Sequence, residues 1–265
     1  MKIKFDFRVV FFIVVLATAV VGKFYTPHDP NLVDMGNILL NPSMQHLLGT
    51  DYLGRDLFSR ILAGAWTTVS TSLMILILSI MIGVTLGLIA GYIGGKTDWI
   101  IMRFIDSFVA FPDYIIAIVI SGILGGGTTN LIIAIVCIKW IAYARVTRAQ
   151  VKVEKSKDYI AMAKINGVSN FNILIKHLLP HVFEEIVAMA TADMGKVVLI
   201  IASLSYIGLG VQPPNPEWGY ILNEGRTYFA TNPILMIAPG VAIVLVVLST
   251  NLLGNYISEK IRDRK

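Results

Sequence analysis

Long apolar stretches recur along the sequence, and their length restricts what the chain can fold into. A helix needs about 20 consecutive apolar residues to cross the hydrocarbon core of a bilayer. Six segments come near this length: residues 9–25, 69–93, 99–124, 131–143, 186–208 and 232–258. Only 15% of the residues are charged, against about 25% in a typical soluble domain. The sequence therefore predicts an all-α polytopic membrane protein, with six transmembrane helices in one membrane domain at residues 1–265.

The distribution of lysine and arginine predicts the orientation, since loops on the cytoplasmic side carry an excess of these residues. With the N-terminus in the cytoplasm, only four basic residues fall outside: Lys23, Arg55, Arg60 and Arg226. Sixteen fall inside: Lys2, Lys4, Arg8, Lys96, Arg103, Arg145, Arg148, Lys152, Lys155, Lys157, Lys164, Lys176, Lys260, Arg262, Arg264 and Lys265. Both termini are therefore predicted to be cytoplasmic. The net charge of +5 then follows from topology and requires no nucleic-acid partner.

The first apolar segment has a second interpretation, as a cleaved signal peptide. Lys2, Lys4 and Arg8 precede its apolar core, and residues 17–19 (Ala-Thr-Ala) resemble a signal-peptidase site. A retained anchor keeps both termini in the cytoplasm, as the charge distribution favours. We therefore expect the segment to remain in the protein.

Residues 150–182 connect two apolar segments on the predicted cytoplasmic side. Within them, residues 158–182 predict a short helix, a glycine hinge at Gly167, a second short helix and a stop at Pro180. An amphipathic segment in such a loop has an apolar stripe that a partner must cover. This loop is therefore predicted to dock another protein chain.

Other patterns resemble chemical motifs but lack essential parts. Residues 94–97 (Gly-Gly-Lys-Thr) match the end of a phosphate-binding loop, but Ala90 stands at its first glycine position and a membrane helix precedes it. Pro180 disturbs the helix that would pair His177 with His181 as metal ligands.

His28 and His46 are expected to be isolated from each other in the outer loop at residues 26–66. The single cysteine, Cys137, excludes an intrachain disulfide. The sequence thus predicts no catalytic residue, no cofactor site and no metal site in this chain.

Charged and polar residues within the apolar segments predict contacts inside the membrane. Arg103 with Asp106, and Asp193 with Lys196, have the spacing of an ion pair on one helix. They either face a polar translocation path or brace one helix against another. The candidate path residues are Asp106, Asp193, Lys196 and Asn251.

Small residues and prolines predict how the helices pack. Gly83, Gly87 and Gly91 recur every four residues and predict a face that a neighbouring helix approaches closely. Pro112 and Pro239 lie within apolar segments and permit bends there.

Two outer loops are predicted. In residues 26–66, Thr50 or Asp51 is expected to cap an amphipathic helix on the outer face, with one apolar side: Leu53, Leu57, Phe58, Ile61 and Leu62. Residues 209–231 contain three prolines that stiffen the loop, and Trp218 and Tyr220 suit a membrane interface.

At this level of detail the chain resembles the permease subunits of ABC importers of the peptide and nickel group, over residues 40–255. The matching stretches are HLLGTDYLGRDLFSR, GGKTDWIIMR, YARVTR, residues 158–180, LSYIGLGVQPPNPEWG and NLLGN. The family's cytoplasmic "EAA" signature has Glu-Ala-Ala, a glycine, then Leu-Pro. Ala163, Gly167, Leu179 and Pro180 match it, whereas Ala161 replaces its glutamate and Met162 follows. The resemblance implies ATPase coupling through Asp158, Ala163, Gly167, Leu179 and Pro180.

The resemblance also implies the type I importer permease fold, in a bacterial cell membrane with surrounding lipid. The implied partners are a homologous second permease, two ABC ATPase subunits and an extracytoplasmic solute-binding protein. ATP and magnesium would bind the ATPase subunits, so that this chain is no enzyme and holds no cofactor.

The cargo is left open between two classes. The compact length, the YARVTR segment and the missing signature glutamate resemble the nickel or metal-chelate branch more than the peptide branch. We therefore expect import of nickel or a metal chelate, with di- or oligopeptides as the alternative. The predicted docking loop, and the absence of a repeated half, speak against a channel or secondary transporter that works alone.

Overall fold

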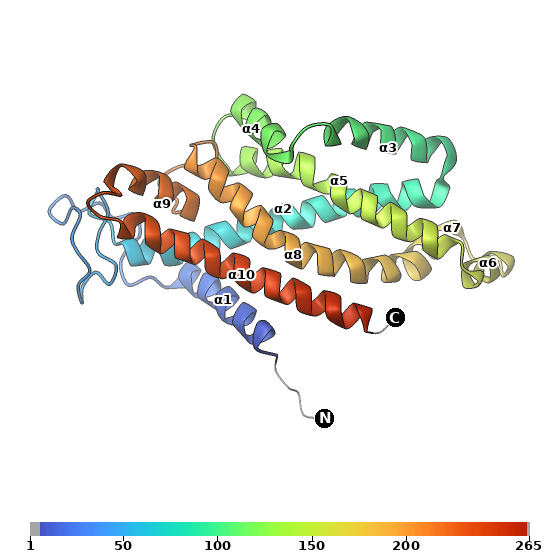
Figure 1. Cartoon of the computed structure of the whole chain (residues 1–265), viewed down its shortest axis with the longest axis horizontal. Helices are drawn as coiled ribbons and strands as arrows, with labels where there is room; N and C mark the ends of the chain where they lie inside the picture. The colour runs from blue at the N-terminus through green and yellow to red at the C-terminus, as the bar shows by residue number, and fades with distance from the viewer. Residues whose placement is uncertain (1–5, 264–265) are drawn as a thin grey trace.

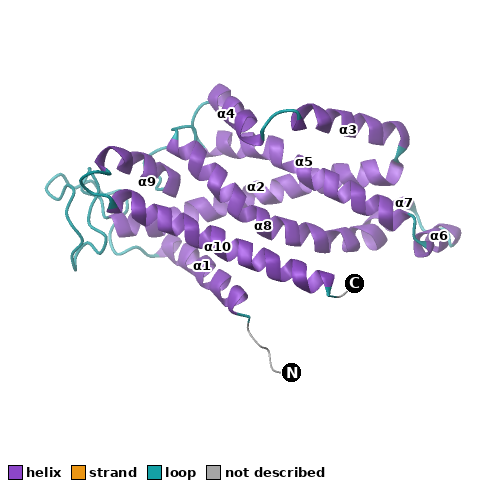
Figure 2. Ribbon diagram, in the orientation of Figure 1, coloured by secondary structure: helices purple, strands orange, loops and turns teal. Residues whose placement is uncertain are grey.

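Long helices, packed side by side, make up most of the computed structural model, which describes residues 6–263 (Figure 1). Five of them are long and apolar enough to cross a membrane: α1 (Phe7–Phe24), α2 (Leu57–Ile93), α5 (Thr128–Lys155), the continuous helix Asn170–Tyr206, and α10 (Ile234–Arg262). Figure 2 shows helices and loops, and no strand, over the described residues. Lys2, Lys4, Arg264 and Lys265, which enter the charge distribution, lie outside these residues.

The segment at residues 99–124 is bent, and the bend lies at Pro112, where the sequence permits one. It forms α3 (Gly95–Val109) and α4 (Asp113–Leu124), which meet at an angle of 86°. The cause is Pro112, which restricts Phe111 to non-helical backbone and starts α4 as its N-cap residue. Counted as one broken span, this pair brings the number of candidate membrane spans to six.

The glycine stripe of α2 packs against α5, as predicted. A methyl group on Gly87 would lie 2.6 Å from the main-chain oxygen of Ala144, and one on Gly91 would lie 2.8 Å from Val151. Gly83 approaches the main chain at Trp140 in the same way. Such separations are below van der Waals contact, so only glycine allows these two helices to lie this close.

The two ends of the helix bundle differ in structure. At one end lie the long loop before α2 and the short helices α9 (Trp218–Gly225) and η2 (Arg226–Tyr228); at the other end lies α6 (Asp158–Ile165) (Figure 1). An ion pair of 2.8 Å between Arg8 and Glu259 joins the start of α1 to the end of α10. Both chain ends, where the structure describes them, are therefore close together.

The predicted amphipathic helix of residues 26–66 is not a separate element. Helix α2 begins at Leu57, is capped by Asp56, and continues without a break to Ile93. Asp51 does not cap it, because its carboxylate accepts hydrogen bonds from the main-chain nitrogens of Leu53 and Arg55 in a turn. Thr50 instead forms an isolated bridge with Asp56.

Trp218 is also placed differently from its predicted position at a membrane interface. It is the first residue of α9 and is buried in the core, where its indole nitrogen donates to the main-chain oxygen of Ile61 (3.0 Å). The loop at residues 209–231 therefore contains a helix that is anchored against α2.

Candidate functional site

The predicted docking loop begins with α6, which ends at Gly167 in a glycine cap. The main-chain nitrogen of Gly167 donates to the main-chain oxygen of Lys164, and that of Val168 donates to the main-chain oxygen of Ala163, both at 3.0 Å. This pair of bonds is a Schellman motif, which requires left-handed backbone at the glycine. Gly167 has φ +76°, so the predicted hinge is confirmed as a chain reversal that favours glycine.

Pro180 does not end the second helix, contrary to the sequence prediction. Ser169 caps α7 (Asn170–Asn172), which runs through the π-helical turn η1 (Ile173–Leu178) into α8 (Leu179–Tyr206). A proline ring clashes with a preceding carbonyl in a regular α-helix. The wider turn just before Pro180 accommodates the ring, and the loop leads directly into a membrane-length helix.

The five residues implied in ATPase coupling occupy different environments. Asp158 is exposed in the first turn of α6, where its charge favours the helix N-terminus. Ala163 is buried against the bundle, Leu179 is half-buried at the start of α8, and Pro180 is exposed.

The tip of the loop exposes large apolar side chains. Met162, Ile165 and Phe171 are 56%, 77% and 71% exposed, while Ile160 and Ile173 are buried beneath them. Three exposed apolar side chains on a short, capped segment form a surface suited to an apolar groove of another chain. We call Met162, Ile165 and Phe171 the loop tip.

Polar contacts attach the loop to the ends of α2 and α5. The carboxylate of Glu154 accepts from Tyr159 (2.7 Å) and pairs with Lys157 (2.6 Å), and Tyr92 donates to Asn170. Burial, and to a smaller extent the hydrogen bond to Glu154, raises the pKa of Tyr159 to about 12. The phenol therefore stays a donor at neutral pH. The loop is therefore attached to the ends of both helices.

His177 and His181 both face the ring of Tyr159, with ring centroids 6.5 Å and 5.9 Å from it. Among the described residues, neither histidine lies close to two further side chains that could bind a metal ion.

Asp193 and Lys196 form the predicted pair on α8, at 3.0 Å. Asp193 is buried and also accepts from the hydroxyl of Tyr143 on α5 (3.3 Å). The Lys196 side chain is 66% exposed, so that the pair joins a buried acid to an accessible base.

Asp106 does not pair with Arg103, contrary to the spacing argument. Its partner is Arg145 on α5, at 2.6 Å. Helical pairs favour the acid on the N-terminal side of the base, and Arg103 precedes Asp106. Arg103 and Asp106 both line a polar hollow of about 360 Å³ between α3 and α5, together with Asp98 and Arg148.

The four candidate path residues therefore do not converge within this chain. Tyr143 and Arg145, which hold Asp193 and Asp106, are two positions apart on α5 and so point to nearly opposite sides of it. Asn251 is exposed on α10.

A buried charge cluster at the opposite end of the bundle was not found from the sequence. Arg55 binds Asp51 (2.6 Å) and Glu224 (2.7 Å), and Arg60 binds Glu224 (2.7 Å), with all four side chains less than a tenth exposed. Tyr52 also donates to Glu224 (2.9 Å). Burial, and to a smaller extent the negative charge of Glu224, raises the pKa of Tyr52 to about 12. We call Asp51, Arg55, Arg60 and Glu224 the charge clamp, since it holds α9 to the start of α2.

The structure also corrects the expectation that His28 and His46 are isolated. The loop before α2 folds back on itself, and the two ring centroids lie 4.9 Å apart. Asp56 lies beside both of them.

Comparison with known proteins agrees with this architecture. Residues 83–263 match the family model described as "Binding-protein-dependent transport system inner membrane component". The nickel transport system permease protein NikC of Escherichia coli strain K12 is 36% identical over 241 residues, which is 91% of this chain and 87% of NikC. The glutathione transport system permease protein GsiD of Pectobacterium atrosepticum is 40% identical over 246 residues, 92% of this chain and 82% of GsiD.

The family match covers more than half of the chain and includes the loop tip, the Asp193–Lys196 pair and the charge clamp residue Glu224. Several helices of membrane-spanning length agree with an integral, multi-pass membrane protein. Importers of this kind work with ATPase and solute-binding partners. The chain therefore belongs to the inner-membrane components of binding-protein-dependent transport systems, as a permease subunit of an ABC importer of the peptide and nickel group.

Proposed function

We propose that this chain forms half of the translocation path of the importer, paired with a homologous second permease, while two ATPase subunits bind below. The observation that carries this proposal is the loop tip. Its exposed apolar side chains lie on a loop that is held by Glu154 and Tyr92 and leads directly into α8. ATP and magnesium belong to the ATPase subunits, and this chain supplies no nucleotide site of its own.

An open apolar groove supports the pairing with a second permease. It has a volume of about 440 Å³ and lies between α8, α9 and α10, with Leu199, Tyr206 and Ile243 in its walls. A second permease with the same fold would cover it with an apolar helix face. The path would then run between the two permeases, beside α8.

We further propose that both termini and the loop tip are cytoplasmic. The basic residues favour this orientation, and the Arg8–Glu259 pair is consistent with it, since it places the start of α1 and the end of α10 on one side. The loop before α2 and the charge clamp would then face outward.

Thiol labelling in intact cells tests the orientation. In a Cys137→Ser background, we expect Met44→Cys to react with a membrane-impermeant thiol reagent, because Met44 is 96% exposed in the loop before α2. Ser156→Cys, an exposed position near α6, should react only after the membrane is opened. The reverse pattern of labelling would reject the proposed orientation.

Asp193 is proposed to face the path. We expect Asp193→Asn to assemble normally and to change the uptake rate, because Lys196 is 66% exposed on the surface of this chain and the amide still accepts from Tyr143. The control is Tyr143→Phe, which removes this hydrogen bond but leaves the charge of Asp193 in place. Loss of the assembled complex in Asp193→Asn would instead assign this residue to bracing of α8.

For the cargo, we propose nickel or a metal chelate. The similarity to NikC supports a metal cargo, as do the compact length and the missing signature glutamate. The similarity to GsiD, which has the higher identity, supports glutathione or another short peptide as the second candidate.

The cargo is tested with the complete complex in proteoliposomes that contain its binding protein. ATP-dependent uptake of Ni²⁺, supplied alone or with free histidine as a chelator, is expected to exceed uptake of glutathione. Uptake of glutathione without uptake of nickel would reject the metal cargo in favour of the peptide class.

A further inference from the structure

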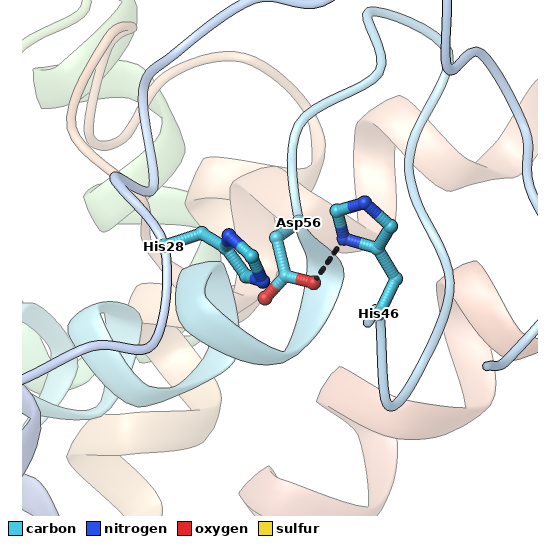
Figure 3. Close-up of side chains that lie close together, drawn as sticks. All are labelled: His28, His46 and Asp56. Atoms are coloured by element: carbon cyan, nitrogen blue, oxygen red, sulfur yellow. Dashed lines mark hydrogen bonds and ion pairs between the residues drawn. The ribbon is translucent and has the colours of Figure 1, made fainter. Parts of the chain in front are cut away.

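Three side chains that can bind a metal ion converge in the loop before α2 (Figure 3). His28 and His46 flank the carboxylate of Asp56, and one ligand atom from each of the three lies within 4.8 Å of the other two. Nδ1 of His46 is 2.9 Å from Oδ1 of Asp56. Two ligands at right angles on one ion, with bonds of about 2.1 Å, lie about 3 Å apart, so this pair already has the separation of neighbouring ligands.

The fold holds Asp56 and His28 in place. Oδ2 of Asp56 accepts from the main-chain nitrogen of Ser59 (2.8 Å), which fixes the carboxylate at the start of α2. The main-chain nitrogen of His28 donates to Oγ of Ser59 (3.0 Å), so both ligands are attached to the same helical turn. Nε2 of His28 contacts the main-chain oxygen of Gln45 (2.8 Å), next to His46.

A loop staple explains only part of this arrangement. The hydrogen bond between His46 and Asp56 by itself would hold the loop to α2. The contacts of His28 with Ser59 and Gln45 bring a second imidazole, from a residue 18 positions earlier in the sequence, to 4.9 Å from the first. A shared ion would use all three side chains, because two imidazoles and one carboxylate are a common ligand set for divalent transition metals.

We propose that His28, His46 and Asp56 form a binding site for a divalent transition-metal ion of the Ni²⁺ or Zn²⁺ class. His28 is exposed whereas Asp56 is buried, so the ion would be held from one side and open to solvent on the other. Three protein ligands leave coordination positions for water or for ligands that arrive with the ion. Such a site exchanges its ion more readily than a closed site with four protein ligands.

The position of the site indicates a role in import. This role rests on the proposed function. In the proposed orientation the loop before α2 faces outward, where the solute-binding protein delivers its cargo. The site would hold a metal ion transiently between release from the binding protein and entry into the path.

The test is direct metal binding to the detergent-purified complex without a polyhistidine tag. Equilibrium dialysis is carried out against Ni²⁺ and repeated with Zn²⁺. The unmodified chain is expected to bind one more ion per permease chain than the variant His28→Ala binds. His28→Ala is expected to weaken binding at least about tenfold, because it removes one of three ligands. Asp56→Asn should weaken it similarly while it keeps a side-chain oxygen to cap α2.

The chain supplies a matched control, because its four histidines form two pairs at different places. The double variant His177→Ala, His181→Ala removes two imidazoles from the loop at the other end, and it should bind the metal as the unmodified chain does. Equal binding by His28→Ala and the unmodified chain would overturn the proposal, as would the absence of binding in both.

The test of this metal site can be distinguished from the test of the proposed cargo. If nickel uptake is ATP-dependent but His28→Ala binds Ni²⁺ normally, the site is wrong and the proposed function stands. If the site binds Ni²⁺ but only glutathione is transported, the site stands and the metal cargo is wrong.

Discussion

Gly167→Val is expected to abolish uptake while the protein still inserts into the membrane. The residue has φ +76°, and no atom lies within 4 Å of the position that a Cβ would take, so the effect arises from the backbone alone. Left-handed backbone costs an L-residue about 1–2 kcal/mol, and a β-branched one more. Valine would therefore favour an extended chain at this position, which breaks the Schellman bonds and moves the loop tip away from the ATPase.

The measurement is uptake and ATP hydrolysis by the same preparation of the complex. Gly167→Asn is the control, because asparagine tolerates left-handed backbone, and it should retain most of the uptake. Normal uptake by Gly167→Val would show that this chain reversal does not couple the permease to its ATPase.

Glu224→Gln is expected to destabilise the folded protein by about 3–5 kcal/mol, because it leaves Arg55 and Arg60 buried without their shared counter-charge. The remaining carboxylate, Asp51, lies 2.6 Å from Arg55 but 3.4 Å from Nε of Arg60, a nitrogen atom without a hydrogen-bond partner among the described residues. One carboxylate cannot balance both guanidinium groups. Detachment of α9 from the start of α2 should follow.

Thermal unfolding in detergent measures this effect. The control is Tyr52→Phe, which removes one hydrogen bond to the Glu224 carboxylate but leaves every charge in place, and it should cost only about 1.5–3 kcal/mol. Equal stability of Glu224→Gln and the unmodified chain would show that the charge clamp does not hold α9 in place.

Features that depend on local sequence could be predicted. The pair Asp193–Lys196 follows from spacing on one helix, and the close packing of α2 follows from the repeat of Gly83, Gly87 and Gly91. The chain reversal at Gly167 was also predicted, since few residues other than glycine tolerate its backbone.

Features that depend on distant residues could not be predicted. Arg60 and Glu224 are 164 positions apart, and Asp106 and Arg145 are 39 apart, so no periodicity within a segment reports their contact. His28, His46 and Asp56 lie 18 and 10 positions apart in the sequence, and only the folding of the loop before α2 brings them together.

The prolines show a further limit of local reasoning. Pro112 breaks a span, whereas Pro180 follows a π-helical turn and Pro239 lies inside α10, and neither of these two ends its helix. Whether a proline ring is accommodated depends on the helix geometry around it, which the residue type alone does not determine.

ATP dependence of uptake in proteoliposomes tests the central claim, that cargo moves through this permease only when ATPase subunits dock at the loop tip. The complete complex with its binding protein is expected to accumulate cargo with ATP and not without it. Replacement of the loop-tip residues Ile165 and Phe171 by serine should release the ATPase subunits and remove the uptake. Uptake by this chain without ATP, or undiminished uptake after both replacements, would contradict the claim.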